Sequence, residues 1–208
     1  MSLRTEQEQL EAFRQWWKNS GWQTLGAITL ALLAYAGWAY WQHHQHNRAE
    51  AASALYQDVL KNPATTTAHS DALAKLRADY GDTFYGQSAL LFLAQDAVGR
   101  SDLEAAEKLL DELIRLNPSD DLAYTARLRS ARVLYSLGKH DAALARLEGE
   151  IPPGFNSLFA ELRGDIYAAK NQPDEARKAY EEALAADAEN ERGNKDMLEM
   201  KLSQVGAR

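Results

Sequence analysis

The stretch that most constrains this chain is an uncharged, largely apolar run over residues 22–41. As an α-helix rising about 1.5 Å per residue, it would be roughly 30 Å long, which matches the hydrocarbon core of a bilayer. Backbone amides inside lipid find no water, so they must bond within their own segment, as they do in a helix. Aromatic residues such as Trp16, Trp22 and Trp41 mark both ends of the run, and such rings favour the headgroup region. The sequence therefore predicts one transmembrane helix over residues 22–41.

Two other interpretations of this run compete with the transmembrane helix. A cleaved signal peptide has a shorter apolar centre behind a compact basic start. Here the preceding residues are mostly polar, and the apolar run continues past Ala36 to Trp41. A helix buried in a soluble domain is the second alternative, and the strongly polar neighbours on both sides disfavour it.

The segment before the run, residues 1–21, is predicted to be cytoplasmic. Within it, residues 5–18 have the pattern of an amphipathic helix, whose apolar side carries Leu10, Phe13, Trp16 and Trp17. We expect it to lie along the membrane surface, as an interfacial anchor or as a docking helix, until Asn19-Ser20-Gly21 turns the chain inward. Arg4, Arg14 and Lys18 precede the run, whereas Arg48 is the basic residue close behind it, and this bias favours a cytoplasmic N-terminus.

Small residues gather on one side of the predicted span. At about 100° per residue, Ala27, Ala31, Ala34 and Gly37 fall within roughly a third of the helix circumference. Such a face lets another helix approach closely, so these residues are a candidate packing face in the membrane. Ala and Gly are also frequent in membrane helices generally, and both interpretations stand at this point.

The charge of the chain argues against a nucleic-acid partner. Its net charge is −7, and residues 1–61 hold equal numbers of acidic and basic side chains, so the excess lies in 62–208. An acidic domain repels phosphate backbones, and we expect no nucleic-acid partner. The chain has no cysteine, which excludes disulfides, thiolate nucleophiles and cysteine metal sites.

Residues 42–83 are predicted to be a helical juxtamembrane linker. His43, His44 and His46 at its start lack matching carboxylates, so a polar collar is favoured over a metal site. The membrane helix is expected to continue until Asn62-Pro63 ends it. A second helix is expected from about Ser70, as its N-cap, to Tyr80.

From residue 84 to 208 the chain shows an internal repeat. Three similar stretches occupy residues 101–113, 138–147 and 171–183, and a helix-like segment precedes each of them, in 87–98, 124–137 and 157–170. An alanine anchors each stretch, and Ala106, Ala143 and Ala176 lie 37 and 33 residues apart. Small residues at these positions let paired helices cross tightly, and stacked hairpins then share one core. An ordinary helical bundle is the alternative.

This pattern resembles the tetratricopeptide repeat, whose first helix carries a small residue and an aromatic, and whose second helix carries Ala, an aromatic, Ala and Pro. The third repeat fits best, through Gly164, Tyr167, Ala176, Tyr180 and Ala183, with Ala188 in place of the usual proline. The first fits at Ala94, Ala106, Leu110 and Pro118, and the second at Ala131, Leu134 and Ala143, with Gly149-Glu150 interrupting its second helix. The predicted fold is all-α: one N-terminal transmembrane helix followed by a tetratricopeptide-like α-hairpin solenoid.

The resemblance implies a protein-binding groove lined by first-helix residues. The candidates are Leu91, Gln95, Leu128, Arg132, Tyr135, Leu158, Glu161 and Asp165. An ordinary solvated inner face is the alternative for each of them. No phosphate loop, dinucleotide fingerprint, nucleophile elbow or His-Glu-Xaa-Xaa-His motif occurs, so we expect no catalysis, no cofactor, no metal and no small-molecule substrate.

Over nearly its full length the chain resembles the YfgM family, the ancillary subunits of the bacterial SecYEG translocon. The similarity is carried by Glu6–Glu11 leading to Trp16-Trp17-Lys18, by Gly37–Trp41 at the end of the span, and by Leu162–Tyr167 before the last repeat. It implies an inner-membrane protein with a periplasmic repeat domain, associated with SecYEG and with the membrane-bound chaperone PpiD, that helps exported proteins reach periplasmic chaperones. A structural scaffold or a regulatory tether in the cell envelope is the alternative.

Overall fold

The computed structural model describes residues 2–116, 120–190 and 194–206, and within these ranges all regular structure is helical. The helices are α1 (Ser2–Lys61), α2 (Thr67–Tyr80), α3 (Phe84–Gly99), α4 (Leu103–Leu116), α5 (Asp121–Ser136), α6 (His140–Arg146), α7 (Pro153–Ala169), α8 (Pro173–Asn190) and α9 (Lys195–Gly206). The predicted all-α class is therefore confirmed. Contacts divide the chain into two units, residues 1–51 and 52–208.

The first unit is the N-terminal part of α1. Its apolar stretch is long enough to cross a membrane, and the remainder of the described chain does not bury it. That finding disfavours the buried-helix alternative, because the apolar side chains have no protein core around them. The predicted turn at Asn19-Ser20-Gly21 is wrong: the backbone stays helical through these residues. A helical Gly costs only about 1 kcal/mol relative to Ala, too little to break a helix by itself, and the Trp17 ring packs over Gly21.

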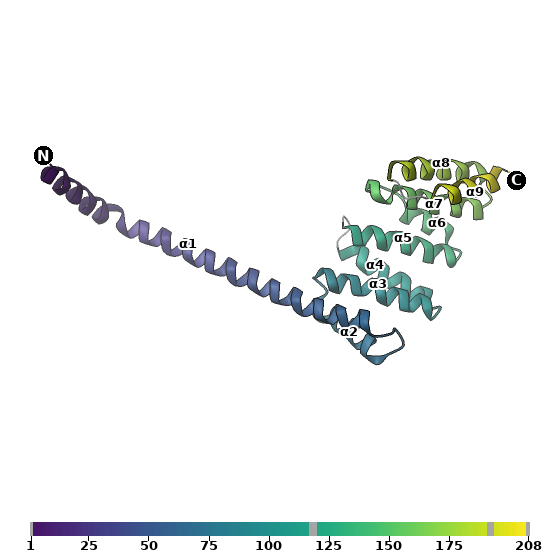
Figure 1. Cartoon of the computed structure of the whole chain (residues 1–208), viewed down its shortest axis with the longest axis horizontal. Coiled ribbons are helices and arrows are strands. Elements are labelled where there is room, and N and C mark those ends of the chain that lie inside the picture. The colour runs from purple at the N-terminus through teal and green to yellow at the C-terminus, as the bar shows by residue number, and fades with distance from the viewer. Residues whose placement is uncertain (1, 117–119, 191–193, 207–208) are drawn as a thin grey trace. The chain divides into compact units, whose positions relative to one another are not determined.

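The second unit is a stack of helical hairpins. Helices α3 and α4, α5 and α6, and α7 and α8 form successive antiparallel pairs, and α2 and α9 pack against the two ends of the stack (Figure 1). The three anchoring alanines, Ala106, Ala143 and Ala176, are completely buried. The stacked-hairpin prediction is therefore correct, and the ordinary bundle is not what forms.

Three equivalent turns join the helices within the hairpins. Ser101, Gly138 and Asn171 have φ values of +61°, +71° and +57°. Each precedes its anchoring alanine by five residues, and in each turn the following amide donates to a carbonyl five residues back, as in Asp102 N–H to Ala97 O at 2.9 Å. This is the left-handed helix ending in which glycine is favoured. The backbone thus repeats even where the side chains differ.

The crossing of α7 and α8 explains Gly164. A Cβ added to Gly164 would lie 2.5 Å from the ring of Tyr180, which is closer than real Cβ contacts. Tyr180 is buried, and its hydroxyl donates to Asp165 Oδ1 at 2.8 Å, so the ring is held in place. Glycine is therefore required at this crossing.

The second hairpin is cut short. Helix α6 ends at Arg146, and Gly149 follows with a φ of +93°. The Arg127 guanidinium donates to Arg146 O at 3.1 Å and also to Glu148 O, so it closes the carbonyl end of α6. It also lies over the rings of Tyr124 and Phe159, each 5.3 Å away. Burial lowers the pKa of this guanidinium.

The end of α1, from Ala52, belongs to the second unit and packs with α2 and α3 in one apolar cluster. Helix α1 ends at Lys61, as Asn62-Pro63 predicts. The predicted N-cap at Ser70 is wrong. Thr66 caps α2 by accepting a hydrogen bond from His69 N–H, because the turn at Pro63 lets the helix begin earlier in the chain. The predicted division between linker and repeats at residue 84 stays a prediction.

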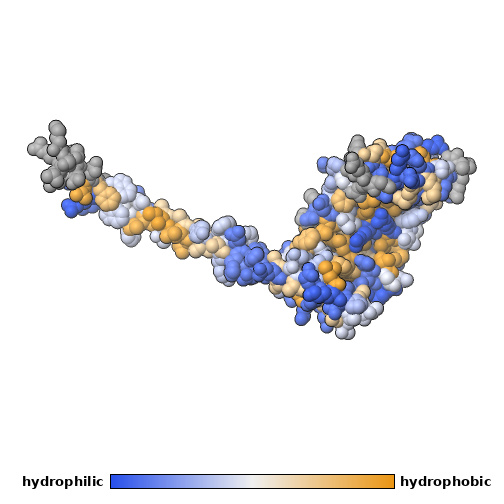
Figure 2. All heavy atoms as spheres, viewed as in Figure 1, coloured by the Kyte–Doolittle hydropathy of each residue, from blue (hydrophilic) through white to orange (hydrophobic). Residues whose placement is uncertain are grey.

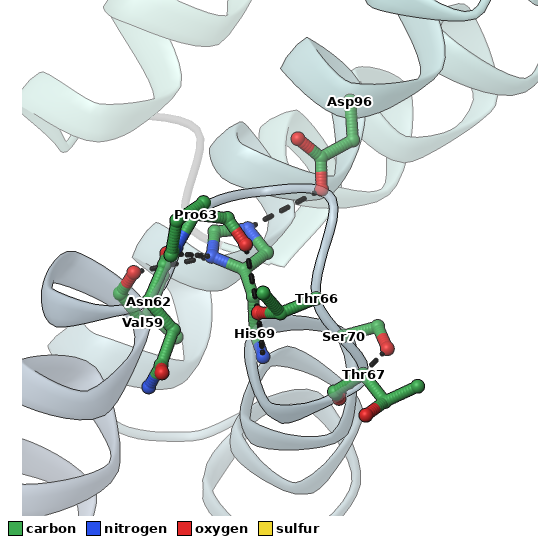
Figure 3. A network of polar contacts seen from close by, with 8 residues as sticks. All are labelled: Val59, Asn62, Pro63, Thr66, Thr67, His69, Ser70 and Asp96. Atoms are coloured by element: carbon green, nitrogen blue, oxygen red, sulfur yellow. Dashed lines mark hydrogen bonds and ion pairs between the residues drawn. The ribbon is translucent and has the colours of Figure 1, made fainter.

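His69 connects three helices in this corner. The residue is 5% exposed, and Nδ1–H donates to Val59 O and Asn62 O, both at 3.1 Å (Figure 3). On the other side of the ring, Nε2 lies 3.4 Å from Asp96 Oδ2 of α3. The last turn of α1 is thereby fixed to α2 and α3.

Helix α9 had no counterpart among the expected elements. Its Leu198 is completely buried beside Ala160, Ala176 and Tyr180. It covers the apolar face that the last hairpin would otherwise expose. Pro118, predicted to end the first repeat, lies outside the described residues.

Candidate protein-binding groove

The first helices of the first two hairpins, α3 and α5, border two adjoining hollows of about 350 and 260 Å³. The two hollows share Gln95 and Arg129, so they form one groove. Its lining is mainly apolar and comes from α1, α3, α4 and α5: Tyr56, Phe84, Ser88, Leu91, Phe92, Ala94, Gln95, Val98, Leu103, Leu110, Leu122, Arg129, Arg132, Val133 and Ser136. We call this set the α3/α5 groove. Figure 2 shows hydrophobic and hydrophilic residues side by side on the viewed face of the repeat unit.

One end of the α3/α5 groove is aromatic. The Tyr56 ring lies 5.3 Å from Tyr85 and 5.8 Å from Phe92, and Phe84 lies 5.7 Å from Tyr85. Phe84 is 60% exposed, which is unusual for so large an apolar side chain. This end can take an apolar side chain from another molecule.

The α5 side of the groove is cationic, with Arg129 bordering both hollows and Arg132 bordering the larger one. Arg129 and Arg132 lie one turn apart on α5, and neither guanidinium has a hydrogen-bond or ion-pair partner among the described residues. Several other arginines of the repeat unit are paired, such as Arg77 with Glu112 at 2.7 Å and Arg163 with Glu182 at 2.6 Å. The two groove arginines are thus available to a ligand.

Three of the predicted groove residues lie together in this groove: Leu91, Gln95 and Arg132. Leu128 does not line it, because it is buried in the second hairpin's core. Tyr135 and Leu158 pack partly buried against that same core, and the Tyr135 ring lies 5.6 Å from His140. These residues belong mainly to the packing between hairpins.

Glu161 and Asp165, the last two predicted groove residues, are engaged by α9. Lys201 Nζ donates to Glu161 at 2.6 Å and to Asp165 at 2.7 Å. Burial alone would lower the pKa of Lys201, but these two hydrogen bonds outweigh it, and the pKa lies above its ordinary value. Burial, assisted by the hydrogen bond to Asp165, also raises the pKa of the Tyr180 phenol. The candidate lining is therefore split between an open groove at α3/α5 and a position already occupied by Lys201.

Sequence reasoning missed the arginine beside Arg132. Helix α5 contributes Val133 to the apolar core that it shares with α3 and α4, and Leu128 and Leu134 to the core that it shares with α6 and α7. It therefore packs against two cores on different sides. That leaves one arc, containing Arg129, Arg132 and Ser136, facing solvent. The predicted lining of Leu128, Arg132 and Tyr135 shares Arg132 with this arc, and its other two positions lie one residue before Arg129 and Ser136. The i, i+3 spacing of two arginines in an acidic domain was the available signal.

The candidate packing face of α1 is exposed in the first unit: Ala27, Ala31, Ala34 and Gly37 contact no other part of the described chain there. Its role stays a prediction. Nearby, His43 contacts Asn47 at 3.2 Å and His46 contacts Glu50 at 3.3 Å. Within the described ranges, no group of three or more His, Cys, Asp or Glu side chains is placed to hold a metal ion.

Comparison with known proteins agrees with the repeat fold of this chain. The family model of the tetratricopeptide repeat-like domain matches residues 14–207. A protein of Aggregatibacter actinomycetemcomitans is 31% identical over 201 residues, covering 96% of this chain and 95% of that protein. A protein of Escherichia coli is 30% identical over 200 residues, covering 96% of each, and one of Neisseria gonorrhoeae is 28% identical over 203 residues, covering 96% and 97%. All three are named "Ancillary SecYEG translocon subunit".

This chain belongs to that family. The resemblance to YfgM proteins is therefore confirmed, and it extends through the apolar helix and the repeats alike. Among solved structures, "MamA 41-end from Desulfovibrio magneticus RS-1" matches with a TM-score of 0.52 and 16% identity, covering 77% of this chain and 94% of that one. At that identity the likeness to MamA shows the fold of the repeats alone.

Proposed function

We propose that this chain is a non-catalytic, membrane-anchored ancillary subunit of the SecYEG translocon whose repeat domain binds other proteins. The observation that carries the proposal is the family membership together with the open α3/α5 groove. The relatives are named as translocon subunits, and they match this chain over nearly their whole length. A largely apolar groove between helices is one of the surfaces by which proteins hold a segment of another protein.

The apolar part of α1 serves as the membrane anchor in this proposal. The basic residues before it favour a cytoplasmic N-terminus, which would place the repeat unit in the periplasm. There the repeat domain would bind membrane-bound chaperones such as PpiD and help exported proteins reach periplasmic chaperones. The small-residue face of α1 would contact helices of the translocon.

Copurification tests the association. The tagged full-length chain, extracted from membranes in mild detergent, is expected to carry SecY, SecE and SecG, and PpiD with them. A variant with Leu substituted at Ala27, Ala31 and Ala34 keeps the span apolar but blocks close helix approach, and it should recover less SecY. Recovery of division or envelope scaffold proteins without SecY would contradict the proposal.

Orientation can be tested cleanly because the chain has no cysteine. A Ser2→Cys variant and a Lys139→Cys variant each carry a single thiol. In cells with a permeabilised outer membrane, an impermeant maleimide should label the cysteine at 139 and spare the one at 2. The reverse pattern would refute the periplasmic placement.

A further inference from the structure

The α3/α5 groove combines three features that specify its ligand: a cationic α5 side, an aromatic end, and no acidic side chain among the described residues of its lining. None of the described residues that line it is an Asp or Glu. We propose that this groove binds a protein segment in which carboxylates flank a large apolar side chain, the carboxylates pairing with Arg129 and Arg132. This inference rests on the proposed function, and it specifies the chemistry of the segment bound.

Charge complementarity carries the first step. The chain has a net charge of −7, and the excess negative charge lies in the same part of the chain as the repeats. An acidic segment is therefore repelled by most of this unit's surface and attracted where two guanidiniums stand without carboxylates. Guanidiniums one turn apart can each hold a carboxylate with two parallel hydrogen bonds.

The apolar walls carry the second step. Arg129 borders both hollows, beside Val98 and Leu103 on one side and Leu91 and Phe92 on the other. Low-dielectric walls strengthen ion pairs formed between them. An apolar side chain bound against Phe84 and Phe92 would expel water from the groove and add to that effect.

Gln95 supplies the third step. It is exposed on α3 and borders both hollows, as Arg129 does. A side-chain amide both donates and accepts hydrogen bonds, so it can pair with the backbone of a segment laid across it. Gln95 and Arg129 both border the two hollows, so a backbone contact and a carboxylate pair can form beside the apolar pocket.

Nucleic acid is the other polyanion that an arginine pair could attract, but two arginines in an acidic domain are too few to hold a phosphate backbone. Lys201 offers no rival site for a carboxylate, because Glu161 and Asp165 already engage it. The proposal therefore commits to the α3/α5 groove and to an acidic, apolar protein segment.

Peptide binding to the full-length chain in detergent micelles tests the inference. The probe is a short fluorescein-labelled peptide with Glu on both sides of a Phe-Leu pair, and the control peptide has Gln in place of each Glu. Fluorescence anisotropy should show the Glu peptide binding at least tenfold more tightly than the Gln peptide, with an affinity that falls as salt rises. Equal affinity for both peptides would overturn the proposal.

Three protein variants locate the binding. R129Q/R132Q should weaken binding of the Glu peptide at least tenfold, whereas K75Q/K108Q, which removes the same charge from exposed positions on α2 and α4, should change it less than twofold. Equal weakening by both variants would refute the groove, because the effect would then be one of net charge. R129E/R132E should reverse the preference toward a peptide with Lys in place of Glu; retained Glu preference in that variant would also refute it.

Failure of this inference is separable from failure of the proposed function. If the wild-type chain recovers SecY from membranes but binds both peptides alike, the groove chemistry is wrong and the translocon association stands. If the arginine-dependent preference is found but no SecY is recovered, the groove chemistry holds and the translocon association is wrong.

Discussion

Replacing Gly164 by Ala gives the sharpest test of how the hairpins pack. The new Cβ would meet the Tyr180 ring at 2.5 Å, about 1 Å inside an ordinary contact. The ring cannot swing aside cheaply, because Tyr180 is 3% exposed and its hydroxyl is bonded to Asp165. Helices α7 and α8 must therefore separate, and overpacking of this kind costs about 1–3 kcal/mol.

Thermal unfolding of the full chain in detergent, followed by circular dichroism, measures that cost. At roughly 2–4 °C per kcal/mol for a domain of this size, a loss of about 2 kcal/mol lowers Tm by about 4–8 °C. Gly99→Ala is the matched control, since its Cβ would meet nothing within 4 Å and Ala favours a helix. Its Tm should stay level or rise.

A double-mutant cycle assigns the cost to the ring. In a Tyr180→Leu background the branched side chain leaves room beside position 164, so Gly164→Ala should cost less than about 1 kcal/mol there. An unchanged Tm for Gly164→Ala in the wild-type background, or the same loss in both backgrounds, would refute the close crossing.

Three further predictions concern the turns, the α1–α2 corner and α9. Gly138→Ala should lower the free energy of unfolding by about 1 kcal/mol because φ is +71°, and Ser101→Gly should leave it unchanged or raise it by up to about 0.5 kcal/mol. Chemical denaturation in which Gly138→Ala stabilises the chain, or Ser101→Gly destabilises it, would contradict the turn assignment. His69→Ala leaves two carbonyls without their donor and should cost about 2 kcal/mol or more, whereas Asp96→Asn, which keeps an acceptor near the ring, should cost less than about 1 kcal/mol; equal Tm losses would refute the bridging role of His69. The pKa values of Lys201 and Tyr180 are raised, so the folded chain holds more protons than the unfolded one and loses stability as the pH rises from about 10 through the folded values. Lys201→Met should flatten that alkaline loss in Tm against pH, and an unchanged slope would show that Lys201 does not hold α9.

The repeat architecture was predictable because its signals are local. Ala106, Ala143 and Ala176 mark close contacts in three hairpins, and all three are completely buried. The apolar run of α1 is a composition signal, so it also needs no tertiary information. Gly164 is predictable as a crossing residue because the tetratricopeptide pattern places a small residue on the first helix where the second helix approaches it most closely.

The binding role of the groove residues stays a prediction, and their positions were harder to predict because the geometry depends on contacts between hairpins. The arc of α5 that faces solvent follows from two cores on different sides of it, and one of those cores includes Phe159 from α7. Likewise, Glu161 and Asp165 look like free acidic groove residues until Lys201, from the following helix α9, is placed beside them. Neither arrangement is a property of one helix, so helical periodicity could not find it.

The start of α2 shows the same limit on a smaller scale. Ser70 and Thr66 are both good capping residues, and which of them caps α2 depends on where the turn after Pro63 ends. Thr66 N–H donates to Pro63 O at 3.0 Å, and that bond fixes the helix start.

Site-specific photocrosslinking in intact membranes tests the central claim most directly. A photoreactive residue is placed at Ala31 in the apolar part of α1, and in a second variant at Gln95 in the α3/α5 groove. The account predicts adducts with translocon subunits from position 31 and with a protein partner from position 95, the latter lost in the R129Q/R132Q background. Adducts confined to lipid and to other copies of the chain would contradict it.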